Sequence, residues 1–190
     1  ELNKFIEPFK KSGQIIFSGA GTSEFVGSTL VPMFQERYFG RVHSIATTDI
    51  VADPKQYISP TEDILVVSFG RSGNSPESVA TVDLANQINP NAKHLIITCN
   101  HEGSLALRDG EEYYSIKLPP ETNDKSFAMT SSYTNMMLAA YMTFNLDKLE
   151  DIKKDLDEVV VKAKETQSED YKIVDKVVTE FDFERIVFLG

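Results

Sequence analysis

A loop rich in hydroxyl groups and glycine follows the most apolar stretch of the chain. Residues 70–78 read GRSGNSPES and come directly after the apolar run 64–69. Ser75, Pro76 and Glu77 are typical of a helix start, with Ser75 as the N-cap. Capping accounts for Ser75 alone and leaves the other serines, Arg71 and two glycines without a structural role. Hydroxyl donors, a cation and pliable backbone at a helix N-terminus bind phosphate well, so we favour a phosphate-binding loop over a simple turn.

A second small-residue loop lies nearer the N-terminus. Residues 18–23 read SGAGTS, and a helical pattern follows them directly. Small residues let the backbone approach a ligand, and the free N–H groups of a helix start favour an anion. A tight turn with Thr22 or Ser23 as N-cap is the alternative interpretation. Glu24 stands where a dinucleotide-binding fingerprint has its third glycine, and the chain has no Gly-Lys-Ser/Thr, so neither nucleotide motif is present.

The third candidate loop is long and polar. Residues 119–132 read PPETNDKSFAMTSS and end in a helix start rich in hydroxyl groups. Loops of this length without regular structure are often functional. Ser126, Thr130 or Ser131 either caps the following helix or contacts a ligand, and the pattern leaves both interpretations open.

The elements that must position these loops alternate between buried strands and helices. Strands are predicted at 15–18, 42–47, 64–69, 94–98 and 113–118. Helices are predicted at 23–38, 76–88, 104–108, 131–145 and 148–181, with a turn-rich segment at 53–60. This alternation predicts an α/β fold with an open, mostly parallel sheet and helices on both faces. Ligands in such sheets lie outside the carboxyl ends of the strands, where all three loops begin.

Composition excludes several classes of protein. The chain has 190 residues, a hydrophobic fraction of 41% and a formal net charge of −10, which indicates a globular protein without a nucleic-acid footprint. No stretch approaches the roughly 20 apolar residues that span a bilayer. A single cysteine, Cys99, excludes an intrachain disulfide and fits a reducing cytoplasm. No metal is predicted, because His, Cys, Asp and Glu show no convincing ligand spacing in the loops.

The two ends of the chain share a pattern. Residues 185–190, RIVFLG, echo residues 14–19, QIIFSG, and both read as a buried strand that runs into glycine. The echo is either chance or a true repeat. Glu1 looks like a cut point inside a longer protein, because the segment it opens has neither an initiator Met nor the layout of a signal peptide. If the repeat is real, we expect the first half of a duplicated protein plus the first strand of its second half.

These residues resemble the SIS (sugar isomerase) domain family. Within it, the resemblance is to the N-terminal domain of the tagatose-6-phosphate ketose/aldose isomerase and galactosamine-6-phosphate deaminase branch. The match runs in order through residues 18–23, 47–49, 68–78, 98–100 and 121–130. It implies a flavodoxin-like, three-layer αβα fold that binds phosphosugars, usually as two tandem domains and usually in an oligomer.

The resemblance also implies a set of ligands. In related enzymes the loop after the third strand reads Ser-Gln-Ser-Gly-Glu-Thr and grips the phosphate. Here Gly70 replaces its first serine, which removes one hydroxyl contact, whereas Ser72 is retained. The implied binding residues are Gly21, Thr22, Ser23, Gly70, Arg71, Ser72, Gly73, Asn74, Ser75 and Ser126.

Catalytic residues are not identified in this sequence. In two-domain members of the family, the ring-opening histidine and the glutamate base lie in the second domain. His43, His94 and His101 do not match that histidine by motif, and each is expected to flank a strand or lie on the surface. We therefore expect the chain alone to be inactive. Residues 1–12 are interpreted as a lead helix, 13–147 as the first SIS domain, 148–184 as a helical connector and 185–190 as the first strand of a truncated second domain.

The predicted function is phosphosugar binding in an aldose–ketose isomerase or deaminase that acts on a hexose 6-phosphate or amino-hexose 6-phosphate. No cofactor is implied, and the expected partners are the phosphosugar and further copies of the chain, without nucleic acid or membrane. Two alternatives stay open. One is a phosphosugar-sensing module without catalysis. The other is a structural half whose apolar run near Met136 and Met137 forms a dimer surface, although such a run is more often internal core.

Overall fold

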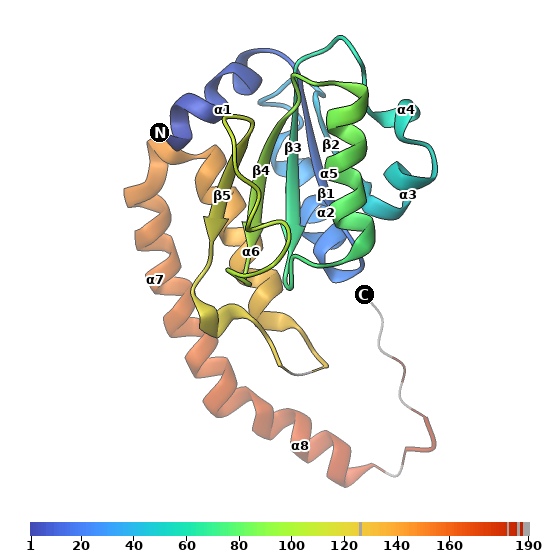
Figure 1. The fold of residues 1–190 in the computed structure, drawn as a ribbon. Coiled ribbons are helices and arrows are strands. Elements are labelled where there is room, and N and C mark those ends of the chain that lie inside the picture. Colours follow the sequence, from blue (N-terminus) through green and yellow to red (C-terminus); the bar gives the residue numbers. More distant parts are fainter. Residues whose placement is uncertain (126, 182, 186, 188–190) are drawn as a thin grey trace. The chain divides into compact units, whose positions relative to one another are not determined.

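A five-stranded parallel sheet forms the centre of residues 1–146. The computed structural model describes residues 1–125, 127–181, 183–185 and 187 (Figure 1). The strands are β1 (Gln14–Gly19), β2 (Val42–Ala46), β3 (Ile64–Gly70), β4 (Lys93–Thr98) and β5 (Tyr113–Lys117). They pair in the order β2-β1-β3-β4-β5, and every pair is parallel. This is the flavodoxin-like strand order, so the predicted fold class is confirmed.

Helices cover both faces of the sheet (Figure 1). One face carries α1 (Leu2–Lys11), α2 (Thr22–Phe34) and α6 (Thr130–Phe144). The other carries α3 (Thr47–Ala52), α4 (Pro54–Tyr57) and α5 (Pro76–Ile88). Successive strand side chains point to opposite faces, so Phe17 and Val67 join the first layer whereas Ile16 and Val66 join the second. The three-layer αβα arrangement follows from two apolar faces on one sheet.

The larger core cluster fixes where α2 begins. The rings of Phe17, Phe34 and Phe144 meet with centroid separations of 5.5 to 6.2 Å. Gly27 lets α2 approach the sheet closely, because a Cβ at this position would lie 2.8 Å from Cβ of Phe17 and 2.5 Å from Oγ of Ser44. The N-terminus of α2 is therefore held directly beyond the end of β1.

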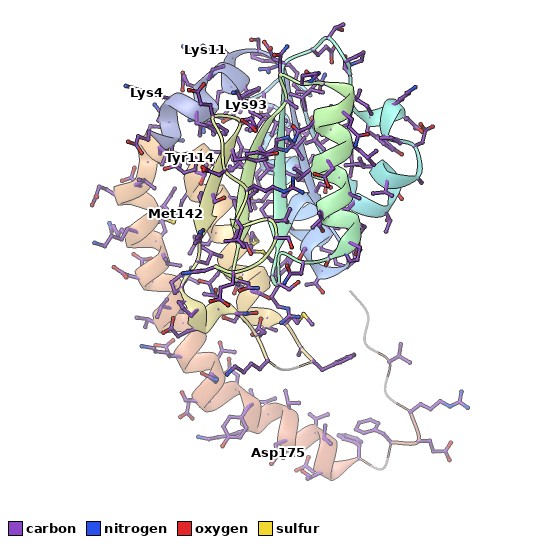
Figure 2. All side chains as sticks on the ribbon, in the orientation of Figure 1. Lys4, Lys11, Lys93, Tyr114, Met142 and Asp175 are labelled. Atoms are coloured by element: carbon purple, nitrogen blue, oxygen red, sulfur yellow. The ribbon has the colours of Figure 1, made fainter. Side chains whose placement is uncertain are left out.

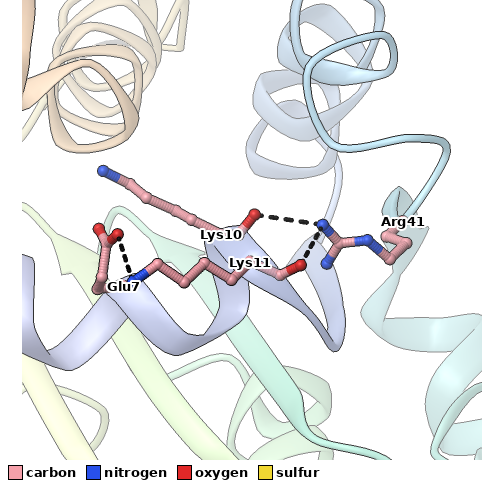
Figure 3. A network of polar contacts seen from close by, with 4 residues as sticks. All are labelled: Glu7, Lys10, Lys11 and Arg41. Carbon is pink, nitrogen blue, oxygen red and sulfur yellow. Dashed lines mark hydrogen bonds and ion pairs between the residues drawn. The ribbon is translucent and has the colours of Figure 1, made fainter.

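Helix α1 is anchored at its C-terminal end by Arg41 (Figure 3). The guanidinium donates to the carbonyl oxygens of Phe9, Lys10, Lys11 and Gly13 over distances between 2.7 and 3.3 Å. These bonds satisfy carbonyls that a helix end leaves without intrahelical partners. Lys11 also pairs with Glu7 at 3.4 Å. The ring of Phe5 on α1 lies 5.6 Å from the ring of Tyr114 on β5. Figure 2 labels Tyr114 on that strand.

Residues 147–190 form a second compact unit. It contains α7 (Leu149–Glu165), a π-helical segment (Thr166–Asp170) and α8 (Tyr171–Glu180), from which side chains such as Asp175 project (Figure 2). The helix predicted over 148–181 is thus divided by the π-helical segment. The strand predicted at 185–190 lies mostly outside the described residues. In the part of the chain that the structure describes, no helix is long and apolar enough to cross a membrane.

Three local predictions were wrong. Residues 104–108 form turns instead of a helix, because the amide of Leu105 donates to the carbonyl of Gly73 at 3.0 Å and not along a helix axis. The turn-rich segment 53–60 contains the short helix α4. Helix α2 ends at Phe34 and not at residue 38, since Phe39 and Gly40 adopt left-handed backbone conformations that turn the chain. Short 3₁₀ turns lie at Pro120–Thr122 and Leu146–Lys148.

The apolar run of α6 belongs mainly to the core. Met136 and Phe144 are buried, and Met137 and Tyr141 are partly buried against the larger core cluster. The burial of these side chains favours the interpretation of the run as core over its interpretation as a dimer surface.

Candidate functional site

A cavity of about 290 Å³ opens at the carboxyl ends of β1 and β3. These two strands adjoin where the strand order reverses, which is the position at which open α/β sheets bind their ligands. Residues 20–23 form one wall, the end of β3 and the start of α5 form another, and Met129 contributes from the third loop. The cavity therefore draws on all three loops singled out in the sequence.

Most of the predicted binding residues meet in this cavity. Its lining includes Gly21, Thr22, Ser23, Gly70, Arg71, Ser72 and Ser75. Gly73 and Asn74 belong to the same loop but line no part of the cavity. Ser126 lies outside the described residues. Four further residues line the cavity and were absent from the predicted set: Ala20, Phe69, Ser78 and Met129. The position of Ser78 in the serine-rich loop motif could have identified it from the sequence. No sequence pattern pointed to Phe69 or Met129 as lining residues.

The first loop leaves its hydroxyl groups available. Gly21, with φ of 56°, occupies the N-cap position of α2, and no side chain caps this helix end. The interpretation of Thr22 or Ser23 as N-cap was therefore wrong. Gly19 has no room for a side chain, because a Cβ there would lie 2.6 Å from the carbonyl carbon of Ser23. The hydroxyl of Ser23 is thus placed at the cavity by a backbone that only glycine permits at position 19.

The second loop is also free of side-chain capping. Ser75 occupies the N-cap position of α5 as predicted, but its hydroxyl makes no capping hydrogen bond. Its carbonyl instead accepts the amides of Ser78 at 3.0 Å and Val79 at 3.1 Å. The capping role predicted for the Ser75 side chain was therefore wrong, and the hydroxyl remains available to the cavity.

The loop after β4 holds the second loop in shape. Asn100 donates from Nδ2 to the carbonyl of Ser72 at 2.9 Å. The Asn74 side-chain oxygen accepts from the amide and the hydroxyl of Ser104 at 2.8 and 3.0 Å. Gly73, with φ of 64°, takes a left-handed conformation that favours glycine. The side chain of Asn74 therefore acts within the scaffold of the loop, whereas Ser72 reaches the cavity.

Arg71 links the second loop to the third. Its Nη1 donates to the carbonyl of Asp124 at 2.7 Å and lies 3.4 Å from Oδ1 of Asn123. The carboxylate of Asp124 in turn accepts the amide of Ser132 at 2.7 Å, which caps α6. This hydrogen bond is the main reason that the pKa of Asp124 is lowered. The cap of α6 thus comes from Asp124, and not from Thr130 or Ser131, whose side chains make no capping bond.

The histidines lie away from the cavity. His94 is buried in the sheet, and burial lowers its pKa to about 4. His43 is exposed on β2, where its ring is bonded to the side chain of Gln14 at 2.9 Å. His101 bonds to the carbonyl of Leu118 at 2.7 Å. His43 and His101 thus lie at the surface as expected, whereas His94 belongs to the core.

The described lining of the cavity offers binding groups but no proton-transfer base. Arg71 is the charged side chain within it, and the other polar side chains there are hydroxyls. Among the described residues, no group of three or more His, Cys, Asp or Glu side chains is placed to hold a metal ion. The arrangement can bind an anion through hydroxyls, a guanidinium and helix N-termini.

Comparisons with known proteins identify relatives of similar sequence and structure. D-galactosamine-6-phosphate deaminase AgaS of Escherichia coli O157:H7 is 44% identical over 147 residues, which are 75% of this chain and 38% of the relative. The crystal structure of tagatose-6-phosphate ketose/aldose isomerase from Escherichia coli matches with a TM-score of 0.72 and 43% identity, over 77% of this chain and 41% of that one. A Clostridium novyi structure, described as a candidate enzyme of the same name, matches with a TM-score of 0.89 and 40% identity, over 94% and 47%.

The chain spans less than half the length of each of these three relatives. A family profile for the SIS domain covers residues 9–146, which is nearly the whole of the first compact unit. Because this profile matches well over half of the chain, the chain belongs to the SIS domain family.

Proposed function

We propose that residues 1–146 bind a hexose 6-phosphate or amino-hexose 6-phosphate, with its phosphate group in the cavity between β1 and β3. One observation carries this proposal: the hydroxyls of Ser23, Ser72 and Ser75 lie in one cavity, at the N-terminal ends of α2 and α5. Helix N-termini favour an anion through their free N–H groups and dipole. The sugar class is taken from the names of the relatives, which act on galactosamine 6-phosphate and tagatose 6-phosphate.

The protein is further proposed to act as an aldose–ketose isomerase or deaminase on such a sugar phosphate. Proton transfer through an enediol or enolamine needs a base beside C1 and C2 of the sugar. Because the described lining of the cavity has neither a carboxylate nor an imidazole, we assign the base to residues outside 13–147. The cavity then holds the phosphate and orients the sugar toward that base. The chain by itself is expected to bind the sugar phosphate without turnover, and no cofactor is part of the proposal.

A sensing role is the second candidate, and the same lining favours it. A sensor needs to bind the phosphosugar and shift a conformational equilibrium, which requires no base. The two candidates differ in turnover by the intact protein. Release of ammonia from galactosamine 6-phosphate, or ketose–aldose exchange with tagatose 6-phosphate, supports the enzyme. Binding without either reaction supports the sensor.

The division of the chain is also a proposal. Residues 13–147 are proposed as a first SIS domain, 148–184 as a helical connector and 185–190 as the start of a second such domain. Assembly into homo-oligomers and a cytoplasmic location complete this proposal.

Isothermal titration calorimetry tests the binding site. Galactosamine 6-phosphate and tagatose 6-phosphate should bind, whereas unphosphorylated galactosamine should not. Ser72→Ala should weaken binding on the order of tenfold, because a hydrogen bond to a charged phosphate is lost. Ser28→Ala is the control, since this exposed hydroxyl on α2 bonds to Glu24 at 2.6 Å and lies outside the cavity. Equal binding of galactosamine, or unchanged binding by Ser72→Ala, contradicts the proposal.

A further inference from the structure

The first turn of α5 brings an additional serine to the cavity. Ser78 lies three residues after Ser75, so the two side chains share a face of the helix start. Ser78 is only 4% exposed, yet it lines the cavity together with Ser72 and Ser75. It is therefore a buried polar residue whose remaining surface faces the candidate ligand.

The hydroxyl of Ser78 makes no hydrogen bond within the described residues. Its oxygen is still accessible from the cavity, because it is not among the fully buried polar atoms that lack a partner. Thr81, one turn further along the same helix and equally buried, donates to the carbonyl of Glu77 at 2.9 Å. Serine and threonine in helices often make this bond to the residue four positions earlier. Ser78 does not make the corresponding bond to Asn74. Because this hydroxyl has no partner within the described residues and the residue lines the cavity, its hydrogen bond is expected to go to the contents of the cavity.

At the end of β3, the part of the cavity lining next to α5 supplies no hydroxyl of its own. Gly70 ends β3 at the cavity and supplies no side chain. A Cβ at this position would lie 3.3 Å from Cα of Gly73 and 3.3 Å from Cδ1 of Leu105, which is a tight fit. A side chain at position 70 would therefore require Gly73 or Leu105 to shift, whereas Ser78 supplies a hydroxyl to the cavity from the helix side.

We propose that Oγ of Ser78 donates a hydrogen bond to the phosphate group held in this cavity, which makes Ser78 a binding residue beside Ser72 and Ser75. The proposal rests on the proposed function of the cavity. The chemistry recognised is a phosphate with at least one free anionic oxygen. Inorganic phosphate and the 6-phosphate of a sugar share that chemistry.

A binding role and a structural role predict opposite effects of substitution. If the Ser78 hydroxyl binds the ligand, Ser78→Ala removes a hydroxyl that makes no hydrogen bond within the unliganded protein and introduces a strong helix former. The melting temperature without ligand should then stay unchanged or rise. Thr81→Ala is the matched control, because it removes a buried hydroxyl that is bonded within the protein and lies outside the cavity. It should lower the melting temperature and leave phosphate affinity unchanged.

The experiment measures the melting temperature and the calorimetric affinity of wild type, Ser78→Ala, Ser72→Ala and Thr81→Ala. The probes are galactosamine 6-phosphate and inorganic phosphate. We expect Ser78→Ala to bind both probes about tenfold more weakly than wild type, without loss of melting temperature.

The other outcomes overturn the proposal in distinguishable ways. If Ser78→Ala binds both probes as wild type does whereas Ser72→Ala is weakened, the role of Ser78 is wrong and the proposed function stands. If Ser78→Ala loses affinity for galactosamine 6-phosphate alone, its hydroxyl contacts the sugar and not the phosphate. A fall in melting temperature that matches that of Thr81→Ala assigns the hydroxyl to the fold. Absence of binding of either probe by wild type overturns both the proposal and the proposed function.

Discussion

Acid sensitivity at His94 is the prediction for which the structure supplies a magnitude. The side chain is fully buried in β4, and its Nε2 is hydrogen-bonded to Oδ1 of Asn86 at 2.8 Å. Its ring stacks on that of Tyr113 with a centroid separation of 5.2 Å, and the phenol accepts a hydrogen bond from Nδ2 of Asn86 at 2.7 Å. Its Nδ1 is buried without a partner in the described part of the chain. A second ring proton, on Nδ1, would therefore have no hydrogen-bond acceptor among the described residues.

The pKa of His94 is accordingly lowered from 6.5 to about 4. Burial is the largest cause, because removing the imidazolium from water disfavours the charged form. Arg108 and Lys93 lower the pKa further by charge repulsion, whereas Asp83 opposes the shift. His94 therefore stays neutral in the folded protein at every pH above about 5.

The sign of the effect on stability follows from proton binding. Because the unfolded chain binds this proton more readily than the folded protein, His94 disfavours folding as the pH falls. Well above pH 6.5 neither state binds this proton, and the protein keeps its full free energy of unfolding. That free energy decreases as the pH falls from 6.5 to about 4, and His94 causes no further change below about pH 4. The lowering of the His94 pKa from 6.5 to about 4 corresponds to a loss of about 2 kcal/mol at pH 5 and about 3 kcal/mol at pH 4.

Urea denaturation at pH 7.5 and pH 5 measures this loss. Between these two pH values, the free energy of unfolding should decrease for both proteins. The decrease should be about 2 kcal/mol larger for wild type than for His94→Gln. Subtracting the variant from wild type removes the titration of the carboxylates that both proteins share. His43→Gln is the control, because His43 is exposed, and it should follow wild type.

A proton NMR titration of wild type gives an independent reading that does not depend on the folding of His94→Gln. The His94 ring resonances should stay in their neutral positions down to pH 5. A midpoint near pH 6.5, or equal pH dependence of wild type and His94→Gln, would refute the reasoning that burial dominates at this site.

The remaining predictions concern the loops around the cavity. Asn100→Ala removes the bond to the carbonyl of Ser72, so calorimetry should show weaker phosphate binding, and urea denaturation a loss of about 1 kcal/mol. Gly103→Ala should cost about 1–3 kcal/mol in the same denaturation assay, since its Cβ would collide with that carbonyl. Arg71→Ala releases the third loop, to which the guanidinium donates, so limited trypsin digestion should cleave faster after Lys125. Cleavage at the wild-type rate would show that Arg71 does not hold this loop.

Local sequence patterns predicted the fold well because they report burial directly. The continuous apolar run of β3 requires cover on both faces, which is the mark of a central parallel strand. Helix α5 was predicted with its observed bounds, 76–88, because Pro76 starts it and Asn89–Pro90 follows it. The helix predicted over 104–108 was wrong because the conformation of this segment depends on a contact that is distant in sequence. The amide of Leu105 is bonded to the carbonyl of Gly73 in the loop after β3, and no local pattern carries that information.

The sequence by itself determined which loops surround the site, because glycine, serine and a helix start after each strand are local features. Only the tertiary structure decided which side chains line the cavity. Asn74 and Ser78 lie in one motif, yet Asn74 is bonded to Ser104 from the neighbouring β4 loop, whereas Ser78 faces the cavity. Similarly, Asp124 caps α6 from outside the helix start in which the cap was expected. The direction of a polar side chain depends on the partners that long-range packing places beside it, and those partners are distant in sequence.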